Sequence, residues 1–265
     1  MKKTKYLPTS SGRCQAPRMV WACCLILSVW SLPLGAYGQS GGSDMGIWTE
    51  IGVEKKVNKK VSLGLDAELR TDNDASRASR WAVGVDGDYK FSKWLKGSVG
   101  YNFLYDRRDK YTYHADGSLN KYARYWTPRH RFHADLTGSW NLGQWELSLR
   151  ERWQYTYRPE HTISGRYDYD QEAFDNEPKT YSGTGKHVLR SRVQVSRALG
   201  KWEPYANIEL YNGWALEKVR YTAGIDLGLT KHHKLGAYYR FQTTHNDSDE
   251  EPDMHILGVS YKYKF

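Results

Sequence analysis

The chain has 265 residues, a formal net charge of +9 at pH 7, and a strongly polar mean hydropathy of −0.77, yet it contains 21 tyrosines and 11 tryptophans. Its three cysteines, Cys14, Cys23 and Cys24, all lie close to the amino terminus. A mature chain that lacks this region has no cysteine, which excludes a disulfide-stapled secreted module, a thiol nucleophile and a cysteine-ligated metal site.

The first 38 residues have the features of a secretion signal. Basic residues precede an apolar run at 19–34, which is too short for a comfortable membrane-spanning helix. Small residues follow at 36–38, so we expect cleavage between Gly38 and Gln39, with a retained anchor as the alternative. Cleavage lowers the net charge to +4 and weakens the case for a nucleic-acid partner. The predicted organisation is a signal peptide at 1–38 and one domain at 39–265.

Apolar and polar side chains alternate in eleven segments of the predicted mature domain. A period of two indicates a strand with one apolar and one polar face, and no helical periodicity is sustained. Each segment has about the length that a tilted strand needs to cross a bilayer. The segments are 46–57, 61–71, 80–91, 94–106, 129–142, 145–158, 187–199, 202–212, 218–230, 235–245 and 254–265.

The connections between these segments alternate between short and long. Tight polar turns are expected at 58–60, 92–93, 143–144, 200–201 and 231–234, and longer loops at 72–79, 107–128, 159–186, 213–217 and 246–253. This alternation, together with the aromatic content, is typical of outer-membrane β-barrels, whose short turns are periplasmic and whose long loops are extracellular.

The predicted fold is therefore all-β: a transmembrane, antiparallel, up-and-down β-barrel. Such barrels usually have an even number of strands, so eleven segments imply one missed strand, within 107–128 or 159–186, or one false strand. We predict twelve strands, with ten as the alternative. Glu151 and Arg197 fall on the apolar face, which indicates a position near a membrane interface or a missed bulge.

The inward face of this barrel is rich in arginine. Three pairs at 129/131, 150/152 and 190/192 are each spaced by two, so both members of a pair share a face. One interpretation is an ion-paired interior that fills the barrel. The other is a basic path that favours anionic solutes. The candidate selectivity residues are Arg70, Arg80, Arg129, Arg131, Arg150, Arg152, Arg190, Arg192, Arg220 and Arg240.

Short motifs in the second half of the chain resemble the oligogalacturonate-specific porins. They are residues 129–131 (RHR), 147–152 (LSLRER), 202–205 (WEPY) with Asn212, and 258–265 (GVSYKYKF). This resemblance implies a twelve-stranded barrel with a basic lumen, in which Arg129, Arg131, Arg150 and Arg152 guide the substrate. Residues 48–50 (WTE), 68–73 (ELRTDN) and 100–101 (GY) are similar to an uncharacterised family of small outer-membrane proteins of Bacteroidota, a resemblance that implies no activity.

An outer-membrane lipase or acyltransferase is the enzymatic alternative. His133, Asp135 and Ser139 share one face, but six residues along a strand place His133 roughly 20 Å from Ser139, too far for nucleophilic catalysis. A nucleophilic serine on a neighbouring strand, Ser148 or Ser196, remains an alternative partner for His133. We expect no enzyme, no catalytic residue, no cofactor and no metal site.

The two longest loops are rich in aromatic residues, which either bind sugar rings or pack as a cap over the barrel. The loop-binding candidates are Tyr111, Tyr113, Tyr125, Trp126, Tyr167 and Tyr169.

The sequence thus predicts a narrow porin-like channel of the outer membrane that favours anionic solutes such as acidic oligosaccharides. A non-conducting structural or ligand-binding barrel is the alternative. The expected partners are outer-membrane lipid, the barrel-assembly machinery through the strand that ends at Phe265, and anionic small solutes.

Overall fold

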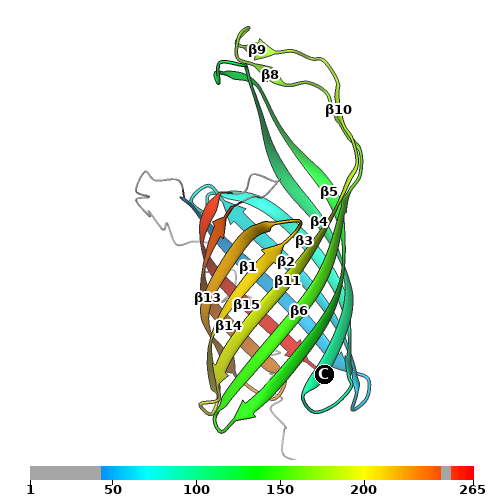
Figure 1. Cartoon of the computed structure of the whole chain (residues 1–265), viewed down its shortest axis with the longest axis vertical. Coiled ribbons are helices and arrows are strands. Elements are labelled where there is room, and N and C mark those ends of the chain that lie inside the picture. Colours follow the sequence, from blue (N-terminus) through cyan, green and yellow to red (C-terminus); the bar gives the residue numbers. More distant parts are fainter. Residues whose placement is uncertain (1–42, 246–251) are drawn as a thin grey trace, which may run out of the picture. The chain divides into compact units, whose positions relative to one another are not determined.

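The computed structural model describes residues 43–245 and 252–265. The expected signal peptide and its cleavage site lie outside these residues, as does most of the expected loop at 246–253. No helix in the described ranges is long and apolar enough to cross a bilayer. All eleven segments predicted from alternation are confirmed as strands, and they form the wall of a closed barrel (Figure 1). They are β1 (Ser43–Lys56), β2 (Val61–Asp72), β3 (Arg77–Lys90), β4 (Leu95–Tyr113), β5 (Leu119–Leu142), β6 (Trp145–Arg158), β11 (Thr184–Arg197), β12 (Trp202–Asn212), β13 (Leu216–Gly228), β14 (His233–Thr244) and β15 (Asp253–Lys264).

The barrel closes through one parallel pair of strands. Ser43 of β1 lies beside Asp253 of β15, and Glu54 lies beside Lys264, so the first and last strands run in the same direction. The other wall strands pair antiparallel with their neighbours, including β4 with β5 and β6 with β11. Strands that alternate in direction around a closed sheet leave one parallel pair when their number is odd. The prediction of twelve or ten strands, and of a wholly antiparallel barrel, was therefore wrong for the described wall.

The two ends of the barrel differ in their connections. The end at which tight turns join the strands is called the turn end. Gly143 and Gly200 adopt φ values of +68° and +64° in two of these turns, a conformation that glycine accepts without strain. The opposite end, called the loop end, carries the longer connections.

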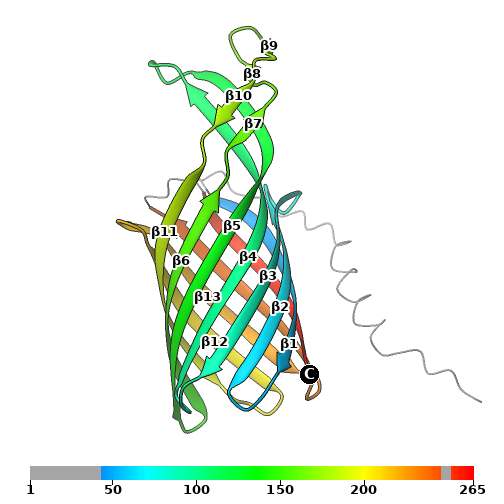
Figure 2. The same ribbon diagram turned by 90° about the vertical axis from the view of Figure 1, so that its right-hand side faces the viewer.

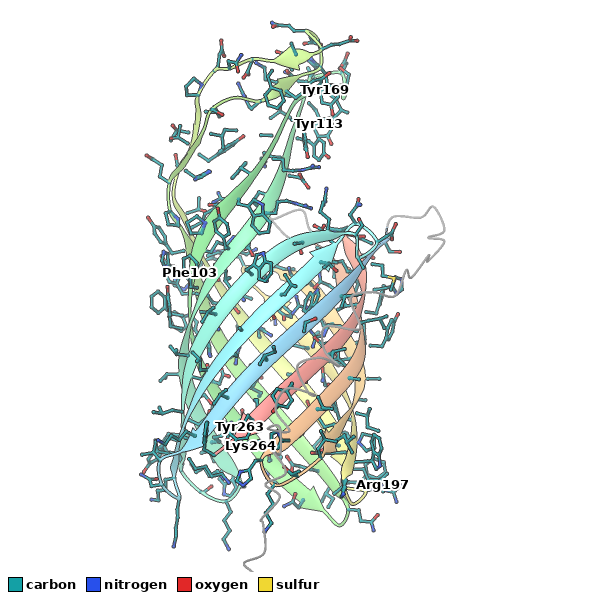
Figure 3. The ribbon with its side chains drawn as sticks, turned by 180° about the vertical axis from the view of Figure 1, so that it is seen from behind. Phe103, Tyr113, Tyr169, Arg197, Tyr263 and Lys264 are labelled. Atoms are coloured by element: carbon teal, nitrogen blue, oxygen red, sulfur yellow. The ribbon has the colours of Figure 1, made fainter. Side chains whose placement is uncertain are left out.

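The outer face of the wall is apolar over most of its height. Side chains that point away from the barrel are exposed although they are large and hydrophobic, for example Val99 at 64%. Aromatic rings gather near both ends; Trp94 and Trp140 stack at 6.3 Å near the turn end, and Tyr105 and Trp126 stack at 5.2 Å near the loop end. Figure 3 shows Phe103 on this outer face, with Arg197, Tyr263 and Lys264 near the turn end.

Glu151 and Arg197 both point outward without a bulge. The Ser191 hydroxyl donates a hydrogen bond of 2.7 Å to the Glu151 carboxylate. The Arg197 guanidinium donates to Gln144 at 3.1 Å and lies 5.2 Å from the Trp145 ring centre, close to the turn end. The expected interfacial position therefore fits Arg197, whereas Glu151 lies among apolar side chains and is held by a neighbouring hydroxyl.

The strands β4 and β5 continue well past the rim of the barrel (Figures 1 and 2). The expected loop at 107–128 is therefore largely strand, because Arg107 to Thr112 pair with residues 121–126 of β5. Residues 107–128 and 159–183 together are called the arm. Four short strands strengthen it: β7 (His161–Ile163), β8 (Tyr167–Asp168), β9 (Ala173–Phe174) and β10 (Lys179–Tyr181). β8 and β9 extend the sheet beside β5, and β7 pairs with β10.

Candidate functional site

A cavity of about 1220 Å³ occupies the interior of the barrel, called the lumen. Its wall includes Lys262 and Lys264 toward the turn end and Lys186 and Trp214 toward the loop end. Among the described residues that line it, 18 are lysine or arginine and 8 are aspartate or glutamate. The cavity thus reaches residues near both ends and has an excess of positive charge.

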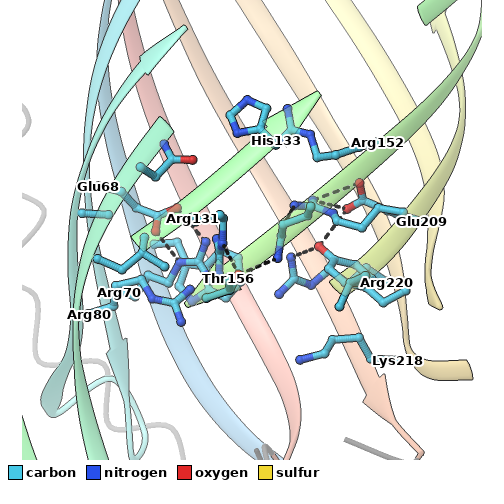
Figure 4. Close-up of a pocket in the computed structure, with 18 of the residues that line it drawn as sticks. Glu68, Arg70, Arg80, Arg131, His133, Arg152, Thr156, Glu209, Lys218 and Arg220 are labelled. Atoms are coloured by element: carbon cyan, nitrogen blue, oxygen red, sulfur yellow. Dashed lines mark hydrogen bonds and ion pairs between the residues drawn. The ribbon is translucent and has the colours of Figure 1, made fainter. Parts of the chain in front are cut away.

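All ten arginines proposed from the sequence line this cavity. The two-residue period of a strand places both members of each spaced pair on the inward face. Pairing between strands then brings the pairs together, because Arg190 lies opposite Arg152 and Arg192 lies opposite Arg150. Figure 4 shows several of these side chains converging in the lumen from different strands.

Glu209 of β12 joins two of the arginines. Its carboxylate accepts hydrogen bonds from Arg150 at 2.5 Å and from Arg190 at 2.9 Å, and the Tyr211 hydroxyl donates to it at 3.0 Å. Arg190 also donates to Gln154 at 3.1 Å. This cluster fixes three neighbouring strands at mid-lumen and agrees with the ion-paired interpretation of the interior.

Two further carboxylates, Asp106 on β4 and Asp135 on β5, also fix lumen arginines. Asp106 of β4 is shared by Arg80 and by Arg129, the latter at 3.1 Å. Asp135 accepts a bidentate pair of hydrogen bonds from Arg152, at 2.6 and 2.5 Å. A bidentate pair holds the guanidinium plane in one orientation. These contacts make part of the arginine wall rigid.

Other lumen arginines lack such partners. Arg131 donates to the Thr156 hydroxyl at 3.4 Å, Arg240 to the Thr222 hydroxyl at 2.9 Å, and Arg220 to the Gln242 side chain at 2.8 Å. Among the described residues, Arg131, Arg192, Arg220 and Arg240 have no carboxylate within ion-pair distance. The lumen therefore keeps positive charge that its own carboxylates do not neutralise.

Trp48 is an inward residue that the reasoning from sequence missed. It is 5% exposed, and its ring centre lies 3.6 Å from the Arg70 guanidinium, 5.0 Å from that of Arg220 and 5.2 Å from that of Arg240. A guanidinium over an indole face is a favourable cation–π arrangement. The sequence contained one signal for this inward position: Trp48 lies two residues before Glu50 and therefore shares the polar face of the first strand.

The aromatic candidates of the arm divide between two faces. Tyr125 stacks between His161 and Tyr181, at 5.2 Å from each, and lines the lumen cavity. Its neighbour Trp126 points the other way and stacks on Tyr105.

The remaining candidates lie nearer the end of the arm. Tyr111 packs against Tyr122 at 4.7 Å, and Tyr167 meets Tyr169 edge-on at 5.2 Å. Tyr113 is 60% exposed, and Figure 3 shows both Tyr113 and Tyr169 toward the end of the arm. The six candidates therefore do not form one continuous surface.

The serines considered for catalysis are not near His133. The His133 Nε2 atom lies 2.9 Å from the Asp86 carboxylate, and Gln154 is its neighbour on β6. Ser148 pairs with Ser139, which is roughly 20 Å from His133 along the strand. Ser196 lies beside Glu146, still nearer the turn end. Within the ranges 43–245 and 252–265, histidine, aspartate and glutamate form no group of three that would hold a metal ion.

Comparisons with known proteins give one family and several distant structural neighbours. No curated protein matches the chain. The beta domain of the Bordetella autotransporter BrkA is 13% identical with a TM-score of 0.48, over 78% of this chain and 82% of that one. The translocator domain of the autotransporter NalP from Neisseria meningitidis is 11% identical with a TM-score of 0.46, over 85% and 91%. A porin refined at 1.8 Å is 11% identical with a TM-score of 0.32, over 77% and 58%.

These likenesses are too distant to bear on function. The family comparison is more specific, because a single family model covers most of the domain that follows the predicted signal peptide. That model, described as "Protein of unknown function (DUF2490)", matches residues 45–252, and the chain therefore belongs to the DUF2490 family.

Proposed function

We propose that the chain is an integral outer-membrane barrel and a narrow channel that favours anionic solutes. The observation that carries this proposal is the lumen cavity, which reaches residues near both barrel ends and is lined by more than twice as many basic as acidic side chains. Rings of charged side chains in a narrow pore select ions by sign.

The apolar outer face supports the membrane location. A soluble protein rarely exposes an apolar surface that encircles it, whereas a transmembrane barrel has an apolar band between two aromatic girdles. In this proposal the tight turns are periplasmic, the arm is extracellular, and the strand that ends at Phe265 serves as the contact with the barrel-assembly machinery.

The arginines without carboxylate partners support the preference for anions. Arg131, Arg192, Arg220 and Arg240 carry charge that mobile counter-ions must balance. Acidic oligosaccharides fit this lumen as solutes, in keeping with the resemblance of residues 129–131 and 147–152 to oligogalacturonate-specific porins. We assign no catalytic role to His133, whose Nε2 atom lies beside the Asp86 carboxylate.

A non-conducting structural barrel is the second candidate. The ion pairs that Glu209, Asp106 and Asp135 form with lumen arginines favour it, because such networks also stiffen and fill small barrels.

Planar-bilayer recordings of the refolded barrel distinguish the two candidates. A channel gives steady openings whose reversal potential in a KCl gradient has the sign of an anion-selective pore. Arg131→Gln and Arg192→Gln reduce this selectivity, whereas Lys59→Gln, in an exposed tight turn outside the cavity, leaves it unchanged. A silent barrel, or a cation-selective one, would refute the proposal.

A further inference from the structure

The charges of the lumen are divided between two opposite walls. The cavity-lining residues of β1, β2 and β3, called the acidic wall, include four carboxylates, at positions 50, 66, 68 and 86, and two arginines. Those of β5, β6 and β11, called the arginine wall, include eight lysines or arginines and, in the described part of the chain, no carboxylate. We propose that the two walls together bind a small dipolar solute, a short peptide, with its ammonium group on the acidic wall and its carboxylate on the arginine wall. Binding of this kind goes beyond the channel proposal, since it requires no conduction.

The two walls face each other across the barrel. Around the described ring of strands, four strands separate β2 from β11 in one direction and five in the other. Asp66 lies five residues from the turn end of β2, and Arg192 lies five residues from the turn end of β11. Equal numbers of strand residues span similar heights, so these two residues lie at a similar level of the lumen. Figure 4 shows the same division, with Glu68 on one side of the lumen and Arg152 on the other.

The acidic wall has carboxylates that the chain itself does not neutralise. Glu68 and Asp86 pair with an arginine and a histidine, at 2.7 and 2.9 Å. Among the described residues, Glu50 and Asp66 have no cation within ion-pair distance, although both line the cavity. Asp66 lies diagonal to Glu50 across the pairing of β1 with β2. Diagonal neighbours on one face are roughly 7–8 Å apart, so one ammonium group, with its three N–H donors, can interact with both carboxylates.

A glycine beside Asp66 leaves space in the acidic wall. Gly84 of β3 is the register partner of Asp66 on one side and of Asn102 on the other, so its missing side chain would point inward. A Cβ atom at Gly84 would lie 2.6 Å from the Asp66 carboxylate and would also meet the Asn102 amide. Gly84 therefore lets both polar groups lie against the wall instead of projecting across the lumen.

The arginine wall has donors that suit a carboxylate. Among the described residues, Arg192 has no carboxylate within ion-pair distance, and its buried Nε–H has no hydrogen-bond acceptor. Arg131 of the same wall donates a long hydrogen bond of 3.4 Å to the Thr156 hydroxyl. The planar fork of a guanidinium matches the two oxygens of a carboxylate. This wall can therefore bind the carboxylate of a solute whose ammonium group lies opposite.

The strands between the two walls carry groups that suit the middle of a peptide. Asn102 of β4 lines the cavity on one side, and Asn207 of β12 and Ser260 of β15 line it on the other. A carboxamide both donates and accepts, so it can pair with the N–H and the C=O of a peptide bond. A short peptide has its two charges at opposite ends and polar amides between them, which is the arrangement that the two walls and these side chains match.

Calorimetric titration of the refolded barrel in detergent with three matched tripeptides tests this proposal. Triglycine carries both charges, N-acetyl-triglycine carries only the carboxylate, and triglycinamide carries only the ammonium group. We expect triglycine to bind several-fold more tightly than either of the others. Asp66→Asn should reduce the affinity for triglycine to that for N-acetyl-triglycine without weakening the latter. Arg192→Gln should weaken the binding of triglycine and N-acetyl-triglycine but not that of triglycinamide.

Glu54→Gln is the matched control. Glu54 lies on β1 four residues from Glu50 and outside the cavity lining, where it pairs with Lys264 at 3.8 Å, so triglycine binding should not change. The gel shift of folded barrel reports whether each variant folds, and Glu50→Gln replaces Asp66→Asn if the latter does not.

The outcomes separate this proposal from the channel. Equal affinities for triglycine and N-acetyl-triglycine, or tighter binding of triglycinamide than of triglycine, would refute the dipolar site and leave an anion-selective channel intact. Preferential binding of triglycine by a barrel that does not conduct would refute the channel and keep the site.

Discussion

The guanidinium of Arg70 lies 3.6 Å from the ring centre of Trp48, and the two residues are register partners on β2 and β1. Arg220 and Arg240 approach the same ring from β13 and β14. One aromatic side chain therefore gathers cations from strands on both sides of the parallel closure between β1 and β15. We expect this cluster of one indole ring and three guanidiniums to form a charged constriction of the lumen.

Replacing Trp48 with alanine is expected to raise single-channel conductance, because the variant removes the ring and frees the three guanidiniums that rest on it. Anion preference should persist, since no charge is lost. Trp81→Ala is the matched control, because Trp81 is 52% exposed on the outer face. Unchanged conductance in the Trp48 variant would show that the constriction lies elsewhere.

Glu209→Gln is expected to destabilise the barrel. The carboxylate neutralises Arg150 and Arg190, and its side chain is 6% exposed, so the variant leaves two buried cations without their partner. Loss of one partner from a buried ion pair costs about 3–5 kcal/mol. Unfolding in urea, followed by the gel shift of folded barrel, measures the change. Glu203→Gln is the control, because the Glu203 side chain is 45% exposed and its pair with Lys234 contributes at most about 1 kcal/mol.

The arm should open at acidic pH before the barrel wall does. A hydrogen bond from the Arg166 backbone N–H and another from Lys121, at 3.0 Å, hold the pKa of Asp175 below its usual range. Because folding lowers this pKa, the contribution is complete above the unfolded value of about 3.9 and is lost as the pH falls through the folded value. Hydrogen exchange at pH 7 and near pH 3 should show selective opening of β8 and β9.

The hydrogen bond between Lys121 and Asp175 also makes the stability of the arm depend on pH in the alkaline range. The hydrogen bonds to Asp175 and Asp168 raise the pKa of Lys121, so the contribution of Lys121 to stability is complete below the unfolded value of about 10.4 and is lost above the folded one.

The variant Asp175→Asn tests the opening at acidic pH and should remove most of the acid-induced change in hydrogen exchange. A variant that still opens on acidification would place the responsible carboxyl elsewhere.

Tyr125→Ala should loosen the arm. The ring stacks on His161 of β7 and Tyr181 of β10, and each aromatic contact of this kind contributes about 0.5–1.5 kcal/mol. We expect faster proteolysis within residues 159–183. Tyr113→Ala, at a position that is 60% exposed, should leave proteolysis unchanged. If the Tyr113 variant is instead cleaved as fast as the Tyr125 variant, the stacking of Tyr125 is not what holds the arm together.

Glu151→Leu should stabilise the barrel in a lipid bilayer. The Glu151 carboxylate faces outward between Leu149 and Trp153, and the Ser191 hydroxyl donates a hydrogen bond to it. An outward charge near the bilayer midplane costs about 2–4 kcal/mol for a basic residue and less for an acidic one. Refolding equilibria in vesicles measure the gain. A large loss of stability would indicate that a membrane partner binds this carboxylate.

The wall strands and their inward side chains were predictable because the pattern that encodes them is local. A strand alternates its faces every two residues, so Leu63 and Leu65 point outward while Asp66 and Glu68 point inward, whatever the strand pairs with. The same rule placed all ten arginines on the cavity wall. The even-number rule for barrels was the source of error, because it added a strand to a count that the alternation already gave correctly.

Contacts between residues far apart in sequence determine three other features. They are the pairing of the first and last strands, the length of the arm and the choice of ion-pair partners. Strand β1 finds β15 only when the sheet closes, and β4 and β5 continue past the rim because each supplies the other's backbone hydrogen bonds. The sequence by itself determined which side chains face the lumen, since that is a matter of local periodicity. Tertiary structure alone decided that Glu209 neutralises Arg150 and Arg190 while Arg131 stays without a carboxylate, because register and barrel curvature set which distant charges meet.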